Sequence, residues 1–180
     1  GNNNSFFGTD SGRSNNADGN SFFGRSSGFD TTTGTSNAFF GLDAGRFNQT
    51  GSQNAFFGRE AGFSNAVSGN SFFGYRAGFR NTTGGANSFF GENAGQANTG
   101  GSFNSFFGKF AGLSNTVGDA NSFFGNLSGR DNTTGNFNSF FGESAGTLNT
   151  SGSNNSFVGD NAGNRNTTGF GNSFVGRSAG

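Results

Sequence analysis

Residues 70–84 read Asn-Ser-Phe-Phe-Gly-Tyr-Arg-Ala-Gly-Phe-Arg-Asn-Thr-Thr-Gly, and the chain repeats this stretch with small changes from one end to the other. Residues 121–135 are a second clean copy. Each copy contains a Phe-Phe or Phe-Val pair, and successive pairs are 16 or 17 residues apart. The pairs begin at Phe6, Phe22, Phe39, Phe56, Phe72, Phe89, Phe106, Phe123, Phe140, Phe157 and Phe174. A fixed period of this length predicts stacked repeat units.

The composition of the repeat excludes helices, because each period carries at least three glycines and little besides alanine that favours helix. Asn-Ser-Phe-Phe-Gly is typical of a short strand, Ala-Gly-x-x-Asn can supply a second one, and Asn-Thr-Thr-Gly is a turn. We therefore expect an all-β fold, a β-solenoid (β-roll) of ten to eleven coils with 16–17 residues each. Coils stacked about 4.8 Å apart would make a rod roughly 50 Å tall with stacked Phe, Asn and Gly ladders.

The repeat fills residues 1–180 as a single array, and two of its periods are one residue short. The short periods end before Asn20 and Asn70, and the missing residue falls just ahead of these two positions. A segment that tolerates deletion is a loop. Because the pattern is already running at Gly1 and still running at Gly180, we expect the chain to be a segment of a longer repeat protein whose rod continues at both ends.

Neighbouring residues of a strand point to opposite faces, so the two rings of a Phe-Phe pair cannot share one interior. One column fills the coil, while the other faces outward and would expose about 500 Å² or more. A wide or triangular coil could instead fold a turn over the second ring. Otherwise the outward column is an oligomer interface, with parallel packing of copies about it. The expected interface residues are Phe7, Phe23, Phe40, Phe57, Phe73, Phe90, Phe107, Phe124, Phe141, Val158 and Val175.

Three further kinds of column have structural interpretations. The Asn columns that begin at Asn4 and Asn15 predict side chains hydrogen-bonded along the rod and to turn amides, rather than a ligand site. The Gly columns that begin at Gly8 and Gly12 indicate positive φ or a lack of room for a Cβ. The charges that follow the first Gly column alternate in sign, so they are expected to set coil register. They are Arg25, Asp43, Arg59, Glu60, Arg76, Glu92, Lys109, Glu143, Asp160 and Arg177.

The residue inventory argues against an enzyme. Without His and Cys, the Ser-His-Asp and Cys-His arrangements and zinc sites of those ligands are excluded. Lys109 is the single lysine and does not lie in a phosphate-binding loop, and the Gly-Gly-x-Gly-x-Asp pattern of calcium β-rolls is absent. We expect no catalytic residue, no cofactor and no metal.

Charge and hydropathy limit the partners. Ten basic and ten acidic residues cancel, which removes the positive surface that nucleic acid or an anionic membrane would require. No apolar run is long enough for membrane insertion. Asn-x-Ser/Thr sequons could carry glycans in the turn expected to be exposed, although Asn-Thr-Thr-Gly is also simply a good turn sequence. The sequons of this turn lie at Asn48, Asn81, Asn132, Asn149 and Asn166.

The repeat resembles the 17-residue Asn-Thr-Ala-Ile-Gly-x-x-Ala-Leu-x-x-Asn-Thr-Thr-Gly repeats of bacterial surface proteins and phage tail fibres, and the β-roll repeats of trimeric autotransporter adhesin heads. It departs from them in carrying Phe-Phe in place of small-then-aliphatic residues, and Gly in place of Leu. The resemblance implies a β-roll that serves as a fibre shaft or in surface attachment, outside the cell or at its surface.

Three functions follow as hypotheses. The first is a structural filament, stalk or fibre shaft whose partner is itself, by lateral or head-to-tail association. The second is an adhesin head that binds surface glycans. The third is an ice-binding solenoid, suggested by one Thr column, although adjacent Thr residues do not share a strand face. The column comprises Thr82, Thr99, Thr116, Thr133, Thr150 and Thr167.

Overall fold

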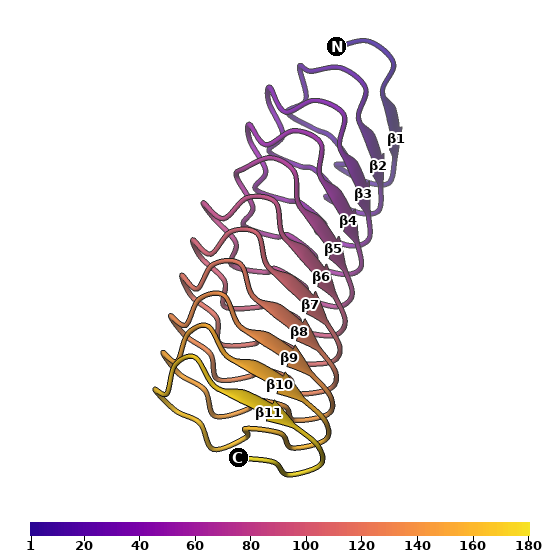
Figure 1. Ribbon diagram of the computed structural model, residues 1–180. Helices are drawn as coiled ribbons and strands as arrows, with labels where there is room; N and C mark the ends of the chain where they lie inside the picture. Colours follow the sequence, from indigo (N-terminus) through magenta and orange to yellow (C-terminus); the bar gives the residue numbers. More distant parts are fainter.

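The protein, described over residues 1–180 by a computed structural model, is a rod of stacked coils (Figure 1). Each coil supplies one three-residue strand, and the 11 strands form one parallel sheet in chain order. The strands are β1 (Ser5–Phe7), β2 (Ser21–Phe23), β3 (Ala38–Phe40), β4 (Ala55–Phe57), β5 (Ser71–Phe73), β6 (Ser88–Phe90), β7 (Ser105–Phe107), β8 (Ser122–Phe124), β9 (Ser139–Phe141), β10 (Ser156–Val158) and β11 (Ser173–Val175). The all-β solenoid with one coil per repeat is confirmed.

The strands pair in register, so identical residues stack from coil to coil. In β5 and β6, Phe72 lies opposite Phe89 and Phe73 opposite Phe90. Only 20 of the 122 backbone hydrogen bonds lie within the strands. Many of the others join the turns of neighbouring coils, as in the 2.9 Å bond from the Gly45 amide to the Ala61 carbonyl. The whole coil outline is therefore held in register along the rod.

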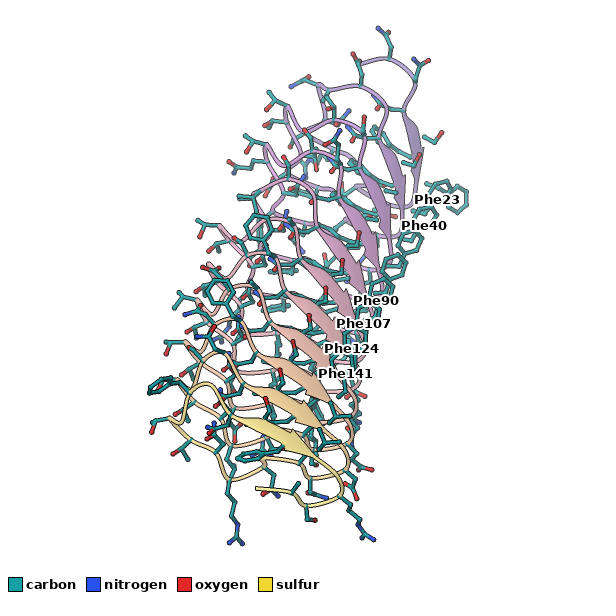
Figure 2. The ribbon with its side chains drawn as sticks, viewed as in Figure 1. Phe23, Phe40, Phe90, Phe107, Phe124 and Phe141 are labelled. Atoms are coloured by element: carbon teal, nitrogen blue, oxygen red, sulfur yellow. The ribbon has the colours of Figure 1, made fainter.

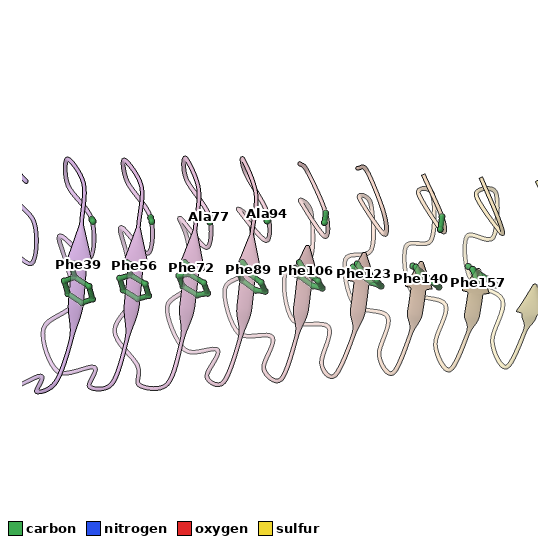
Figure 3. Close-up of a cluster of buried hydrophobic side chains, with 14 of the residues drawn as sticks. Phe39, Phe56, Phe72, Ala77, Phe89, Ala94, Phe106, Phe123, Phe140 and Phe157 are labelled. Atoms are coloured by element: carbon green, nitrogen blue, oxygen red, sulfur yellow. The ribbon is translucent and has the colours of Figure 1, made fainter. Parts of the chain in front are cut away.

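The first ring of each pair forms the core (Figure 3). From Phe22 to Phe157 these rings have no exposed surface, and their centroids are 4.7–5.0 Å apart. Alanines of the Ala-Gly step, such as Ala77 and Ala94, are buried in the same cluster. Gly78 shows why the next position is glycine: its φ is +60°, and a Cβ there would lie 2.4 Å from the Phe72 ring. The core is thus one aromatic stack closed by small residues.

The expected second strand is absent, because Ala-Gly-x-x-Asn is a turn. Bonds three residues apart close it, from the Ala61 amide to the Gly58 carbonyl and from the Asn65 amide to the Gly62 carbonyl. The residue before the alanine has a left-handed backbone, as at Glu60 with φ 58° and Arg76 with φ 55°. A left-handed residue in every coil cannot belong to an extended strand.

Two Asn ladders line the rest of the interior, as the sequence predicts. In the first column, the Asn37 amide donates to the Asn20 Oδ1 at 2.9 Å, and the Asn37 Nδ2 donates to the Gly51 carbonyl. In the second, the Asn98 Nδ2 donates to the Asn81 Oδ1 at 2.6 Å and to the Gly101 carbonyl. Both ladders satisfy buried amides that would otherwise be costly to remove from water.

The short periods lose their residue in the turn, as expected. In a full coil the Asn48 Nδ2 donates to the Gly51 carbonyl three residues on, whereas the Asn65 Nδ2 donates to the Val67 carbonyl two residues on. Gly69, with φ 78°, then occupies the left-handed position before the next strand. The ladder therefore continues unbroken past the deletion.

Candidate interaction surface

The second ring of each pair forms a stacked column on the outside of the sheet, from Phe23 to Phe141 (Figure 2). Neighbouring rings have centroids 4.5–4.9 Å apart and planes within 4–7° of parallel. Within β3–β8 these rings are half-buried, because each covers the faces of its neighbours. Phe7 and Val175 at the ends are 75% and 78% exposed. No turn folds over this outer Phe column, so its outer edge is open.

A lane of small side chains runs beside the outer Phe column on the same face. Strand alternation points the first and third residues of each strand the same way, and in β3–β8 both are half-buried while the residue between them is buried. The lane holds only serine and alanine: Ser5, Ser21, Ala38, Ala55, Ser71, Ser88, Ser105, Ser122, Ser139, Ser156 and Ser173. Sequence reasoning missed this Ser/Ala lane, although the same alternation could have revealed it.

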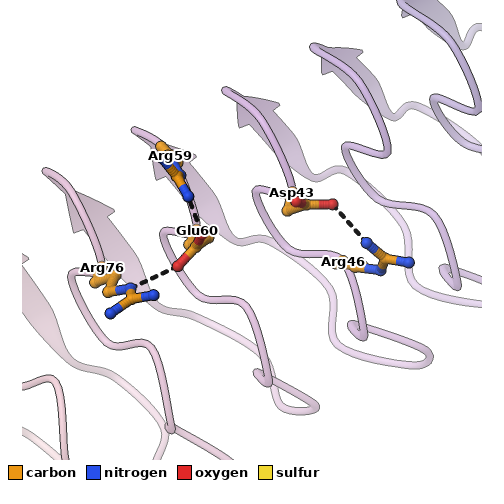
Figure 4. A network of polar contacts seen from close by, with 5 residues as sticks. All are labelled: Asp43, Arg46, Arg59, Glu60 and Arg76. Carbon is orange, nitrogen blue, oxygen red and sulfur yellow. Dashed lines mark hydrogen bonds and ion pairs between the residues drawn. The ribbon is translucent and has the colours of Figure 1, made fainter.

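Charged side chains occupy the turn that follows the sheet (Figure 4). Glu60 accepts from the Arg59 Nε at 3.0 Å within its coil and from the Arg76 Nε at 2.5 Å in the next. Lys109 joins Glu92 of the preceding coil at 2.9 Å. Other pairs, such as Asp43–Arg46 at 2.8 Å, lie within one coil. The predicted coil-to-coil pairing therefore holds for part of this edge.

Glu60 is the carboxylate with a perturbed pKa. Its partial burial raises the pKa, but hydrogen bonds from Arg76 and Arg59 and their positive charges lower it more, so the pKa lies below the ordinary value of 4.5. Each arginine also lies over the Tyr75 ring, at 5.7 Å for Arg59 and 5.1 Å for Arg76. The two arginines keep the Glu60 carboxylate ionised, and that carboxylate forms an ion pair with each of them, one in its own coil and one in the next.

The five sequon asparagines of the Asn-Thr-Thr-Gly turn do not project into solvent. Asn48, Asn81, Asn132 and Asn149 have no exposed surface, and Asn166 is half-buried. Each donates its Nδ2 to a glycine carbonyl three residues on, and all but Asn48 also donate to the Asn of the preceding coil. The interpretation of these residues as lying in an exposed turn is therefore wrong at the side-chain level, because the second Asn ladder uses the atom that a glycan would occupy.

One position breaks the second Asn ladder. Thr31 stands in the column between Asn15 and Asn48 and has no exposed surface. Its Oγ1 has no hydrogen-bond partner. Asn48 accordingly lacks the side-chain partner in the preceding coil that Asn65 and later members have.

The fold contains neither a metal-ligand cluster nor a pocket. No three His, Cys, Asp or Glu side chains approach closely enough to hold a metal ion, and the surface has no pocket. No helix is present that is long and apolar enough to span a bilayer. Comparisons with protein-family models, curated proteins and solved structures gave no match. The outer face of the sheet, with its outer Phe column and Ser/Ala lane, is therefore the candidate interaction surface.

Proposed function

We propose that this chain is a structural rod whose copies associate side by side through the outer Phe column, as a filament, stalk or fibre shaft at or outside the cell surface. The observation that carries the proposal is the unbroken outer Phe column, with open ring edges from β2 to β9 and Val158 and Val175 continuing the apolar column on β10 and β11. A continuous apolar stripe of this extent is a mark of an interaction surface. The resemblance to surface-protein and tail-fibre repeats supports the same location and role.

The stacking of the rings separates this surface from a glycan site. Sugar rings bind aromatic faces, whose negative potential attracts their C–H groups. In the outer Phe column each face is covered by the next ring at 4.5–4.9 Å, so edges alone remain available. Ring edges favour another apolar, close-packed surface.

Sedimentation tests the proposal. The variant Phe73→Lys/Phe90→Glu/Phe107→Lys places opposite charges on adjacent coils, which avoids like-charge repulsion within the rod. We expect the unaltered chain to assemble and the variant to sediment as an 18.4 kDa monomer with an unchanged circular dichroism spectrum.

The control for that experiment makes the same charge changes on a turn edge, as Ser36→Lys/Gln53→Glu/Ala86→Lys. These three residues are exposed and already have left-handed backbones with side chains attached. The control should assemble like the unaltered chain. A stable monomer of the unaltered chain at all concentrations would defeat the proposal.

Head-to-tail association is the second route to a filament. β1 and β11 each pair on one side only, and Phe6 of the core column is 39% exposed at its end. Stacking β11 of one copy on β1 of the next would continue both ladders and satisfy the strand edges. Rods whose length grows with concentration in electron micrographs would support this route.

A glycan-binding head is the second candidate, favoured by two rings on the turn edge. Phe103 and Phe137 are 70% and 63% exposed and stack on no other ring. They occupy the same column two coils apart, with Ala120 between them, so their faces are open. Both have left-handed backbones, a costly conformation for a bulky residue. Retention of the chain on insoluble cellulose or chitin, lost in Phe103→Ala/Phe137→Ala, would support this candidate.

The ice-binding alternative has weaker support, because the Thr column is used within the rod. The Thr82 Oγ1 donates to the Thr99 carbonyl at 3.0 Å, and the Thr116 Oγ1 donates to the Thr133 carbonyl at 2.9 Å. Hydroxyls bonded along the axis are less available to order water. Thermal hysteresis of the purified chain measures this directly.

A further inference from the structure

The outer face of the sheet has a ridge and a groove that run side by side from β2 to β9. The outer Phe column is the ridge, and the Ser/Ala lane two residues earlier on each strand is the groove. Residues two apart on a strand lie about 6.6 Å apart, so ridge and groove run side by side along the rod. The groove contains only the two smallest side chains that carry a Cβ, which indicates that size rather than the serine hydroxyl is its common property.

A second copy of the chain is the partner that fits this relief. A surface that meets the ridge must repeat every 4.5–4.9 Å over the whole sheet, and the chain itself supplies that period in every coil. Phe23 and Phe141 are 38% and 42% exposed and the rings between them are half-buried, so with about 200 Å² for a whole aromatic side chain the ridge and the groove together offer on the order of 800 Å² per copy. That matches the area each partner contributes to a stable interface, about 800 Å².

Symmetry decides how two copies meet. A twofold axis parallel to the rods, placed between ridge and groove, reverses the strand direction and sets the ridge of each copy into the groove of the other. The rods then point the same way, and each coil faces its own equivalent. The column of Arg59, Glu92 and Lys109, which follows the outer Phe column on each coil, lies outside the contact in water.

The alternative twofold axis, parallel to the strands, makes the rods antiparallel. Ridge then meets ridge and groove meets groove, which holds the sheets apart over the Ser/Ala lane and leaves voids. It also brings the two charged columns face to face and removes them from water, which is costly. Packing and desolvation both favour the first arrangement.

We propose that two copies form a parallel dimer in which the outer Phe column of each seats in the Ser/Ala lane of the other, a dry zipper of sheet against sheet. This deepens the proposed function, since it rests on lateral association and specifies its geometry. The Ser/Ala lane becomes as important for assembly as the rings, although it is polar in sequence.

Filling the groove tests the zipper. Ser105→Leu/Ser122→Leu adds apolar surface while leaving every ring in place, and Ser105→Ala/Ser122→Ala is the matched control. If the groove receives the rings of the partner, the leucine variant should dimerise at least about tenfold more weakly than the alanine control, because overpacking typically costs 1–3 kcal/mol. Association that depends on apolar area alone predicts stronger dimerisation. Equal or tighter association of the leucine variant, with unchanged circular dichroism, would overturn the zipper.

Thiol cross-linking supplies the second measurement, because the chain has no cysteine of its own. The zipper sets position 107 of one copy over position 105 of the other. Because facing sheets lie about 10 Å apart, beyond the reach of a direct disulfide, a short bis-maleimide is used; it should join Ser105→Cys to Phe107→Cys in a mixture of the two, and should join neither variant to itself. The control mixture of Ser105→Cys with Phe141→Cys lies two coils out of register and should stay uncross-linked.

The outcomes separate the two proposals. Cross-linking of Phe107→Cys with itself would place ridge on ridge and overturn the zipper while preserving lateral association. An absence of every cross-link, together with monomeric sedimentation of the unaltered chain, would defeat the proposed function itself.

Discussion

The two rings of each Phe-Phe pair are chemically identical and stack at the same interval, yet one is buried in the core and the other lies on the outer face of the sheet. Phe106 in the inner column has no exposed surface, whereas its neighbour Phe107 has an open edge. Centroids in both columns repeat at 4.5–5.0 Å. Stacking is therefore common to both, and the difference lies in what touches the ring edge. The edge of an inner ring is covered by a glycine and an alanine of the same coil, whereas the edge of an outer ring faces solvent or a partner.

The comparison teaches that a ladder has two sources of stability. Every interior residue of a stack gains from the coils above and below, wherever it points. An inward residue gains in addition from closure of the coil around it, and that closure depends on small residues at fixed positions. Outer ladders should consequently tolerate substitution better than inner ones.

The largest expected effect comes from truncating the two rings of one pair separately. Phe106→Ala leaves a cavity in a closed core and should lower the free energy of unfolding by about 3–5 kcal/mol. Phe107→Ala removes a ring whose edge is already in water, and should cost about 1 kcal/mol in the monomer. Urea unfolding of the unaltered chain and the two variants, at a concentration where each sediments as a monomer, measures both losses. Equal losses would show that stacking alone, rather than closure, stabilises the rod.

The next effect tests closure from the glycine side. Gly112 has φ +57°, and a Cβ there would lie 2.4 Å from the Phe106 ring. Gly112→Ala should therefore destabilise by about 2–4 kcal/mol, from backbone strain and displacement of the ring. Gly100→Ala is the matched control, because its nearest atoms lie 3.3 and 3.6 Å away and its φ is not positive. A tolerated Gly112→Ala would mean that the inner column shifts easily to make room.

The sequence predicted the coil count, the register and the opposite orientation of the paired rings, because a period of 16–17 residues and the alternation of a strand determine them. It left open which ring is inside. A signal was present: the first column is Phe in all pairs, whereas the second changes to Val at Val158 and Val175. The inner column is enclosed by glycine and accepts only Phe, whereas the outer column is open and also accepts Val.

The turn in place of the expected second strand was only partly signalled by the sequence. The left-handed position before each Ala-Gly or Ser-Gly step is Asp, Asn or Ser in most coils, which is a turn signal, but it is Glu60, Arg76, Phe110 or Leu127 in the others. Its backbone is fixed by coil-to-coil bonds, such as the Glu60 amide to the Leu42 carbonyl at 2.8 Å. Local sequence reasoning does not see such bonds. The same limit explains the buried sequons, whose side chains are positioned by the neighbouring coil.

A smaller effect concerns the polar ladder inside the coil. Thr31 leaves a buried Oγ1 without a partner where the other coils carry an Asn amide. Thr31→Asn should stabilise the chain by about 1 kcal/mol, since its Nδ2 can donate to the Gly34 carbonyl and its Oδ1 can accept from Asn48. Thermal unfolding measures the gain.

Thr31→Val is the control for ladder completion. It removes the unpaired hydroxyl without supplying an amide, and should gain less than Thr31→Asn. Should the two variants be equally stable, the benefit would come from deleting an unsatisfied group, and the Asn ladder would add nothing at this coil.

The smallest effect tests the outer charged edge through pH. Because the pKa of Glu60 is lowered by folding, its ionised form stabilises the native state above the ordinary value of 4.5, and this contribution is lost as pH falls through the lower folded pKa. Glu60→Gln should therefore be less stable than the unaltered chain near pH 7, and the difference should shrink steadily below about pH 4.5. Glu143→Gln is the control, because Glu143 is exposed and forms no ion pair, and it should change stability little at any pH. Chemical unfolding at a series of pH values compares the three chains. A Glu60→Gln difference that stayed constant down to pH 3 would mean that Glu60 acts by packing alone, and that register on the outer edge, as in the core, is set by the backbone.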